Sequence, residues 1–149
     1  MIQFVDVILK EIFDLGKKYP WKRPSECSRC QSSGKIWSHG YVSAIFDSFT
    51  DPLYLKRYRC QDCGCVITMR PSSHFSRFQS SLKTIRSSLQ HRMTNGRWPV
   101  TGAGPRMRHW ARNLKRQVVA VLGCSWSSGL IAGYDKLLEM GRIPVTRSI

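Results

Sequence analysis

The sequence predicts an α+β protein in which a small four-cysteine β unit is followed by a basic helical, helix-turn-helix-like bundle and preceded by an amphipathic helix. Three observations support this class. Two Cys-x2-Cys pairs flank segments rich in β-branched and aromatic residues. Apolar residues recur at helical spacing in the second half of the chain, and most of the positive charge is found there. A length of 149 residues leaves room for one or two small domains.

The first segment, residues 1–24, is predicted to be an amphipathic helix and a linker. Apolar residues recur at helical spacing from Ile2 to Leu15, and Gly16 and Pro20 are helix stop signals. Charged residues interrupt this apolar run, so it is neither a membrane anchor nor a signal peptide. We therefore expect a cytoplasmic protein with no membrane partner. In a reducing compartment, closely spaced cysteines are more often metal ligands than disulfides.

The second segment, residues 25–71, is predicted to be the β unit. Two β-prone stretches, 35–46 and 54–59, are separated by turn-forming residues at 47–52. The two Cys-x2-Cys pairs stand on either side of this region.

The four paired cysteines, Cys27, Cys30, Cys60 and Cys63, are predicted to hold one structural Zn²⁺. Each pair offers two thiolates from one tight turn, and four thiolates close the tetrahedral shell, which argues against a catalytic zinc. The 29 residues between the pairs exceed the commonest spacing of ~15–20 and require a longer hairpin or an insertion. Unrelated free cysteines or a redox pair remain the alternatives.

The other candidate ligands fit this pattern less well. Cys65 could compete with Cys63, although the two-residue spacing favours Cys63. His39 and His74 are the alternative ligands, but the four histidines have no ligand spacing among themselves. Cys124 stands alone and is predicted to be a small buried residue.

The third segment, residues 72–149, is predicted to contain three helices. The first runs from Ser72 or Ser73 to Asn95 on an apolar stripe that begins at Phe75. The second begins at Pro105 and ends at Gly123, and the third runs from Ser128 to Met140.

The charge distribution predicts a polyanionic partner. The chain carries 24 Lys and Arg against 9 Asp and Glu, a formal charge of +15. Residues 56–149 hold 17 of the basic residues and only 3 of the acidic ones. This balance is unlike that of an ordinary cytosolic enzyme and typical of a nucleic-acid-binding surface.

The second predicted helix separates an apolar face, with Trp110 and Leu114, from a basic one. Its N-terminal end is where a recognition helix reaches base edges. We predict nucleic-acid contacts from this helix and from the basic run before the second cysteine pair: Lys56, Arg57, Arg59, Arg106, Arg108, His109, Arg112, Lys115 and Arg116. A solvated basic helix face, and a polar strand face with Tyr54 and Tyr58 inward, are the alternatives. Trp98 and Trp110 are predicted to be core anchors.

The run from Arg57 to Gly64, with Cys27-x2-Cys30 and the stretch 36–41 before it, resembles the zinc-ribbon head of bacterial insertion-sequence transposases and of short proteins encoded beside them. The stretch 104–110 is more loosely similar to the start of the recognition helix in their helix-turn-helix domains. The similarity covers about residues 25–116 and implies recognition of mobile-element ends or repression of the element's promoter. Ser28 and Gln31 depart from the family's Pro and Gly, and Cys65 and Ile67 from its basic residue and Phe.

The resemblance does not extend to catalysis. Transposases of this kind carry three acidic residues that hold two metal ions, whereas the late acids here are Asp135 and Glu139. We therefore expect no enzymatic activity but a zinc-dependent DNA-binding accessory or regulatory subunit of a mobile genetic element, nucleoid-associated if the source is bacterial. Its expected partners are duplex DNA in preference to RNA, and a separate transposase or nuclease subunit. The alternative is an adaptor or RNA-binding subunit of a larger nucleoprotein complex that docks a catalytic partner.

Overall fold

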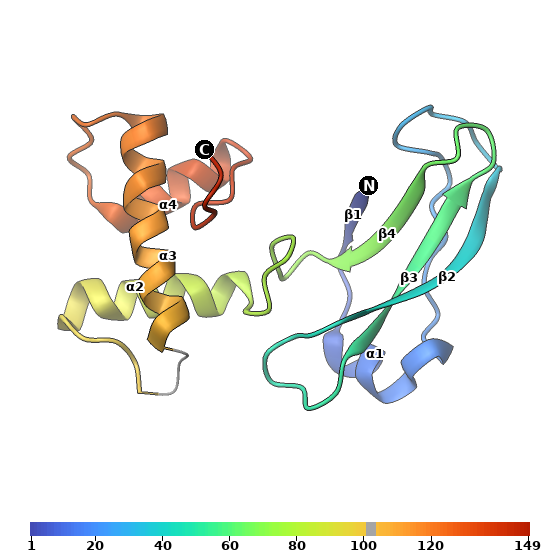
Figure 1. Ribbon diagram of the computed structural model, residues 1–149, viewed down its shortest axis with the longest axis horizontal. Helices are drawn as coiled ribbons and strands as arrows, with labels where there is room; N and C mark the ends of the chain where they lie inside the picture. The colour runs from blue at the N-terminus through green and yellow to red at the C-terminus, as the bar shows by residue number, and fades with distance from the viewer. Residues whose placement is uncertain (101–103) are drawn as a thin grey trace. The chain divides into compact units, whose positions relative to one another are not determined.

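The computed structural model describes residues 1–100 and 104–149 and divides into two units, Met1–Ser81 and Leu82–Ile149 (Figure 1). It confirms the α+β class. The sequence places the boundary earlier, between residues 71 and 72. The first unit contains β1 (Ile2–Val5), α1 (Leu9–Leu15), the 3-10 turn η1 (Gly16–Lys18), β2 (Ile36–Ala44), β3 (Leu53–Cys60) and β4 (Val66–Pro71). The second contains α2 (Leu82–Asn95), α3 (Gly104–Gln117), the π-helical turn η2 (Val118–Leu122) and α4 (Leu130–Glu139).

The strands of the first unit form one mixed sheet in the order β1-β4-β3-β2. The chain runs β2-β3-β4 as successive antiparallel hairpins, and β1 lies parallel to β4 at the far edge (Figure 1). Between the pairs Ser38–Tyr58 and Tyr41–Lys56, β2 has one extra residue and forms a bulge. Gly40 there has a φ of +81°, a conformation open to glycine without strain.

Strand β1 corrects the prediction of one helix over residues 2–16. Thr68 donates its N–H to the carbonyl of Met1 at 2.9 Å, and Ser72 donates to Val5 at 2.8 Å. The free edge of β4 therefore supplies backbone partners that an isolated segment lacks, and Ile2, Phe4 and Val5 suit a strand. The helix is confined to α1, which ends at Gly16.

Strand β3 connects the two apolar clusters of the first unit. Ile12 of α1 packs with Phe46, Leu53 and Leu55. The second cluster lies at the cysteine end and contains Cys27, Ile36, Tyr58, Cys60, Ile67 and Met69. Because successive side chains of a strand point to opposite faces, the buried side of β3 changes between Leu55 and Tyr58. The cysteine end therefore has its own core on the opposite face.

Residues 72–81 are a loop of the first unit, which corrects the helix predicted from Ser72 or Ser73. The Arg70 guanidinium donates to the carbonyls of Phe75 at 3.0 Å and Phe78 at 2.8 Å. Asp47 donates its N–H to the carbonyl of Gln79 at 3.0 Å. Arg77 has a φ of +67°, which interrupts a helix. The Phe75 ring is buried, so its apolar spacing reflects a loop folded onto a core.

The second unit is a small helical assembly. Its buried side chains come from all three α-helices and include Ile85, Leu89, Met107, Trp110, Leu114, Tyr134 and Leu137. The prediction of a helix from Pro105 to Gly123 is confirmed except that its last turn, η2, is π-helical. The third helix is confirmed as α4. A Cβ on Gly133 would lie 2.7 Å from a Val118 methyl, so glycine permits the close approach of α4 to η2.

Two sets of polar contacts stabilise this assembly. The Arg86 guanidinium of α2 binds Asp135 of α4 through two hydrogen bonds of 2.9 and 2.8 Å. The buried Asn113 amide of α3 donates to the carbonyl of Val145 at 3.1 Å, which fastens the C-terminal tail to α3. Among the described residues, no helix has the length and apolar character that a membrane span requires.

Candidate metal centre and basic helix face

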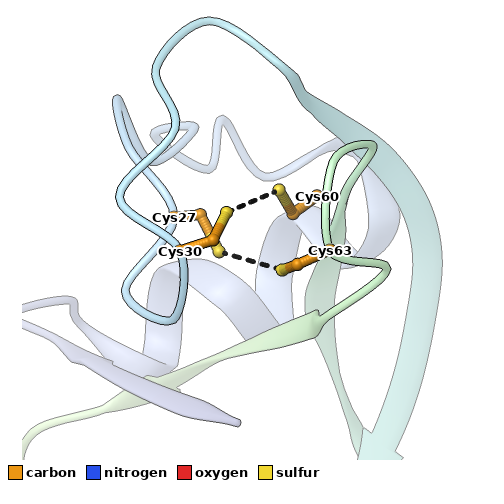
Figure 2. Close-up of side chains that lie close together, drawn as sticks. All are labelled: Cys27, Cys30, Cys60 and Cys63. Atoms are coloured by element: carbon orange, nitrogen blue, oxygen red, sulfur yellow. Dashed lines mark hydrogen bonds between the residues drawn. The ribbon is translucent and has the colours of Figure 1, made fainter.

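The four predicted ligands, Cys27, Cys30, Cys60 and Cys63, lie together, with all four Sγ atoms within 4.8 Å of one another (Figure 2). The Cys27–Cys63 and Cys30–Cys60 sulfur pairs are 3.7 and 3.6 Å apart. Both distances are too long for a disulfide, whose sulfurs are ~2.05 Å apart. A tetrahedral ion with metal–sulfur bonds of ~2.3 Å holds its ligands ~3.8 Å apart. The cluster therefore has the size and the donor set to hold one metal ion.

The two Cys-x2-Cys turns have the same backbone geometry. Gln31 donates its N–H to the carbonyl of Cys27 at 2.8 Å, and Gly64 donates to that of Cys60 at 3.0 Å. Both donors have a left-handed backbone, with φ of +61° at Gln31 and +70° at Gly64. Glycine adopts this conformation freely, whereas it costs another residue about 1–2 kcal/mol. Gln31 is therefore the strained residue of the first turn, whereas Gly64 is unstrained in the second.

The environment of the thiols favours a bound cation. The Ser32 hydroxyl and the backbone N–H groups of Cys63 and Asp62 lower the pKa of Cys60 to about 6. Backbone N–H groups of Cys30 and Arg29 likewise lower the pKa of Cys27. The N–H of Cys65 acts in the same direction on Cys63, but burial and the neighbouring sulfurs outweigh it and raise the pKa of Cys63 to about 12. A divalent ion compensates the charges that the sulfurs impose on one another.

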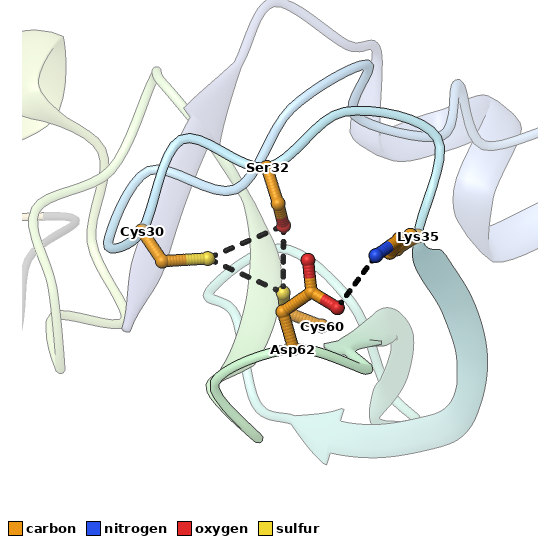
Figure 3. Close-up of polar contacts among 5 residues, drawn as sticks. All are labelled: Cys30, Ser32, Lys35, Cys60 and Asp62. Carbon is orange, nitrogen blue, oxygen red and sulfur yellow. Dashed lines mark hydrogen bonds and ion pairs between the residues drawn. The ribbon is translucent and has the colours of Figure 1, made fainter.

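Three polar contacts that the sequence did not predict support the cluster (Figure 3). The Ser32 Oγ lies 3.2 Å from the Cys30 sulfur and 3.3 Å from the Cys60 sulfur, so it bridges one ligand from each pair. The Lys35 ammonium binds the Asp62 carboxylate at 3.1 Å. Serine residues are too common beside turns for spacing to have identified Ser32. Its bridging position appears only once both turns are folded together.

The remaining candidate ligands lie outside the cluster. Cys65 packs against the apolar core at the cysteine end, and its thiol lies 3.8 Å from the carbonyl of Val66. His74 is buried against the Phe46 ring, with ring centroids 4.8 Å apart, and its Nδ1 is 2.8 Å from the Ser73 Oγ. Cys124 is exposed, which corrects the prediction that it is buried.

The cluster brings together two parts of the chain that lie far apart in the sequence. Cys27 and Cys30 lie in a loop with one isolated bridge, Glu26–Ser33, whereas Cys60 and Cys63 border the β3-β4 connection. Cys27 and Cys60 are also fully buried members of the apolar cluster. A metal ion bound here would act as a structural cross-link, since four protein thiolates leave no coordination position for a substrate.

Helix α3 carries the main basic surface of the second unit. Its buried side consists of Met107, Trp110, Asn113, Leu114 and Gln117. All six predicted contact residues of this helix are exposed: Arg106, Arg108, His109, Arg112, Lys115 and Arg116. The helix contains no acidic residue. Burial of one side and attachment of the C-terminal tail therefore hold a basic face toward solvent.

The three predicted contact residues of β3 do not lie on one face of the sheet. Lys56 lies directly opposite Tyr41, with its ammonium 4.3 Å from the centre of the Tyr41 ring. Arg57 and Arg59 alternate with it and belong to the other sheet face. Tyr58 is buried as the alternative reading expected, but Tyr54 is exposed.

The two tryptophans predicted to be core anchors differ in environment. Trp110 is buried, as predicted. Trp98 is only half-buried, and the Arg92 guanidinium lies 5.6 Å from its ring centre.

Comparison with known proteins adds no family or relative: no family model, no curated protein and no solved structure matches this chain.

Proposed function

We propose that the protein is a zinc-dependent DNA-binding protein that acts as an accessory or regulatory subunit of a mobile genetic element. The observation that carries the proposal is the basic face of α3, on which five exposed side chains lie opposite a buried apolar side: Arg108, His109, Arg112, Lys115 and Arg116. Ordinary solvated helix faces mix both signs of charge, whereas this helix contains no acid to neutralise its cations.

Zinc is the metal that best suits the first unit. Four thiolates in a tetrahedron are the donor set of structural zinc sites, and the sulfur spacing matches Zn–S bonds of ~2.3 Å. The ion would fix the first unit as a zinc ribbon, because its binding energy is also folding energy in a site built from two loops.

Duplex DNA suits α3 because a straight helix with one basic face fits the major groove. The exposed residues of its first turns, Arg108 and Arg112, would read base edges, and Lys115 in the last turn would contact phosphate. The helix is anchored on its other side by Trp110 and by the amide of Asn113. In this proposal α2 and α3 form the helix-turn-helix of the protein.

The association with a mobile element comes from the resemblance of residues 57–64 to the transposase zinc ribbon. Both late carboxylates form ion pairs within the second unit, which accords with a non-catalytic role. Asp135 is paired with Arg86, and Glu139 with Lys136 at 3.2 Å. Strand cleavage would then come from a separate transposase or nuclease subunit.

The test is equilibrium binding of the zinc-loaded chain to labelled duplexes at two salt concentrations. The variants Arg108→Ala and Arg112→Ala should each weaken the preferred duplex by about 1–3 kcal/mol and bring it closer to unrelated sequences. The variant Lys115→Ala should weaken all duplexes alike.

Arg142→Ala is the matched control, because Arg142 is an exposed basic residue of the same unit outside α3. Losses of equal size from Arg142→Ala and Arg108→Ala would contradict a specific role for α3.

A further inference from the structure

Register in the sheet places Trp37 and two arginines on one face of the first unit. Trp37 pairs with Arg59, and Arg59 pairs with Val66 of β4. Two residues along β3, Arg57 pairs with Thr68, which pairs with Ile2 of β1. Paired residues and residues two apart share a sheet face. These side chains therefore form two neighbouring rows across all four strands.

Helix α1 covers the Leu53 and Leu55 end of this face, whereas the end at the cysteines is open and its aromatic side chains are accessible. The Trp37 side chain is 59% exposed at one edge of the sheet, and Phe4 on β1 is 48% exposed at the other. Strands lie ~4.8 Å apart, so three strand spacings separate these edges by roughly 14 Å. So large an exposed indole is uncommon, since large aromatic rings normally bury most of their surface. Here it stands beside an exposed arginine.

The charge on this face has one sign. The four strands, all within the described residues, contain no Asp or Glu. Arg59 is exposed, and the Nε of Arg57 is buried without a hydrogen-bond partner in the described part of the chain. A buried guanidinium nitrogen without an acceptor is costly. An anionic ligand on this face would bring acceptor oxygens to the exposed Arg59 guanidinium and to the accessible part of the half-buried Arg57.

The opposite face supplies a comparison within the same sheet. There Lys17 and Lys56 lie 6.0 and 4.3 Å from the centre of the Tyr41 ring. The Tyr41 hydroxyl donates to the carbonyl of Lys17 at 2.8 Å, and Lys17 also covers Tyr54 at 5.0 Å. Those cations and rings already form cation–π contacts with one another. No such pairing involves Trp37 or Arg59 among the described residues.

We propose that the face carrying Trp37, Arg59 and Arg57 binds single-stranded nucleic acid. An unpaired base would stack on the Trp37 indole, and Arg59 and Arg57 would bind the adjoining phosphates, the usual combination at single-strand sites. A duplex does not fit this chemistry, because its base faces are covered by their neighbours. The inference concerns the first unit alone and does not depend on duplex reading by α3.

The test uses the full zinc-loaded chain and a fluorescein-labelled oligothymidine of twelve nucleotides, with binding followed by anisotropy near physiological salt. Trp37→Ala should weaken binding about fivefold or more, the effect expected from loss of one stacked base. Trp37→Phe should retain most of the affinity, and Arg59→Gln should weaken it. Zinc content and melting temperature check that each variant is folded.

The matched controls come from the opposite face. Tyr54→Ala removes an exposed aromatic ring of β3, and Lys17→Gln removes the exposed cation of η1 that lies over the Tyr41 and Tyr54 rings. Both should change the affinity less than twofold. Irradiation of a 5-bromouracil-substituted oligonucleotide bound to the protein should give a cross-linked peptide that contains Trp37.

Three results would overturn the proposal: unchanged binding by Trp37→Ala, equal losses from Tyr54→Ala, or cross-links confined to α3. The duplex variants separate it from the proposed function. If Arg108→Ala and Arg112→Ala weaken duplex binding but not oligothymidine binding, both surfaces are functional and distinct. If those variants leave duplex binding unchanged while Trp37→Ala still weakens oligothymidine binding, only the α3 proposal fails.

Discussion

The left-handed backbone at Gln31 gives the sharpest prediction for the metal centre. Its N–H must reach the carbonyl of Cys27 across the first cysteine turn, and the φ of +61° that this requires costs about 1–2 kcal/mol for any residue but glycine. The side chain is exposed and makes no hydrogen bond or ion pair in the described part of the chain. Gln31→Gly removes the strain without removing a contact.

The expected gain is smaller than the strain itself. Glycine loses more conformational freedom on folding, at a cost of roughly 0.5–1 kcal/mol. The net stabilisation should be about 0.5–1 kcal/mol, which raises the melting temperature of a unit of this size by about 2–8 °C. Thermal unfolding of the zinc-loaded protein, followed by circular dichroism, measures it directly.

The second cysteine turn offers the matched control. Gln61 is exposed and has an ordinary negative φ, so Gln61→Gly introduces the same flexibility without relieving strain and should destabilise by roughly 0.5–1 kcal/mol. The reasoning is refuted if the two substitutions change stability in the same direction, because only Gln31 has the left-handed backbone that glycine relieves.

Three further predictions concern the first unit. Ser32→Ala removes the hydroxyl that bridges Cys30 and Cys60 and should weaken zinc binding at least tenfold in a chelator competition. The control is Ser33→Ala, at the exposed neighbouring residue. Similar zinc affinities of the two variants would contradict a role for the Ser32 bridge. Removal of the metal by a chelator, or Cys60→Ser, should unfold the cysteine end of the sheet while the helices of the second unit persist. Hydrogen exchange of the backbone amides would detect this difference. If amide protection in the first unit is the same with and without metal, the structural role is refuted. Burial, and secondarily the charge of Arg70, lowers the pKa of His74 from 6.5 to about 4, so between these pH values the unfolded chain binds a proton that the folded chain does not. Stability should fall as the pH drops from 6.5 to 4, by at most roughly 3 kcal/mol. In urea titrations, His74→Asn should remove this part of the loss. Parallel stability–pH profiles of the wild-type and His74→Asn proteins would contradict the role of His74.

The features that the sequence predicted correctly are those encoded by local spacing. Two residues between paired cysteines suffice to form a turn that brings both thiols to one side. The sequence therefore predicted the grouping of Cys27, Cys30, Cys60 and Cys63. The sequence predicted helices α3 and α4 from their apolar periodicity and from the stop signals at Gly123 and Gly141.

The features that the sequence did not predict depend on distant partners. Strand β1 has only four residues, and its apolar pattern also suits a helix; the edge of β4 decides between them. The stripe at Phe75 and Phe78 has helical spacing, but Arg70 binds the carbonyls of both and holds a loop. The face shared by Trp37 and Arg59 depends on the β2-β3 register, which no local pattern reveals.

We propose that the protein reads duplex DNA through α3 in a zinc-dependent fold. Selection of bound duplexes from a random pool by the zinc-loaded chain, at low and near-physiological salt and with structured RNA as competitor, tests this proposal. Binding through phosphates alone collapses as salt rises, whereas base readout survives. We expect a converged sequence motif at the higher salt, and Arg108→Ala and Arg112→Ala should degrade it. Salt-sensitive binding without any motif, or full displacement by the RNA, would contradict it.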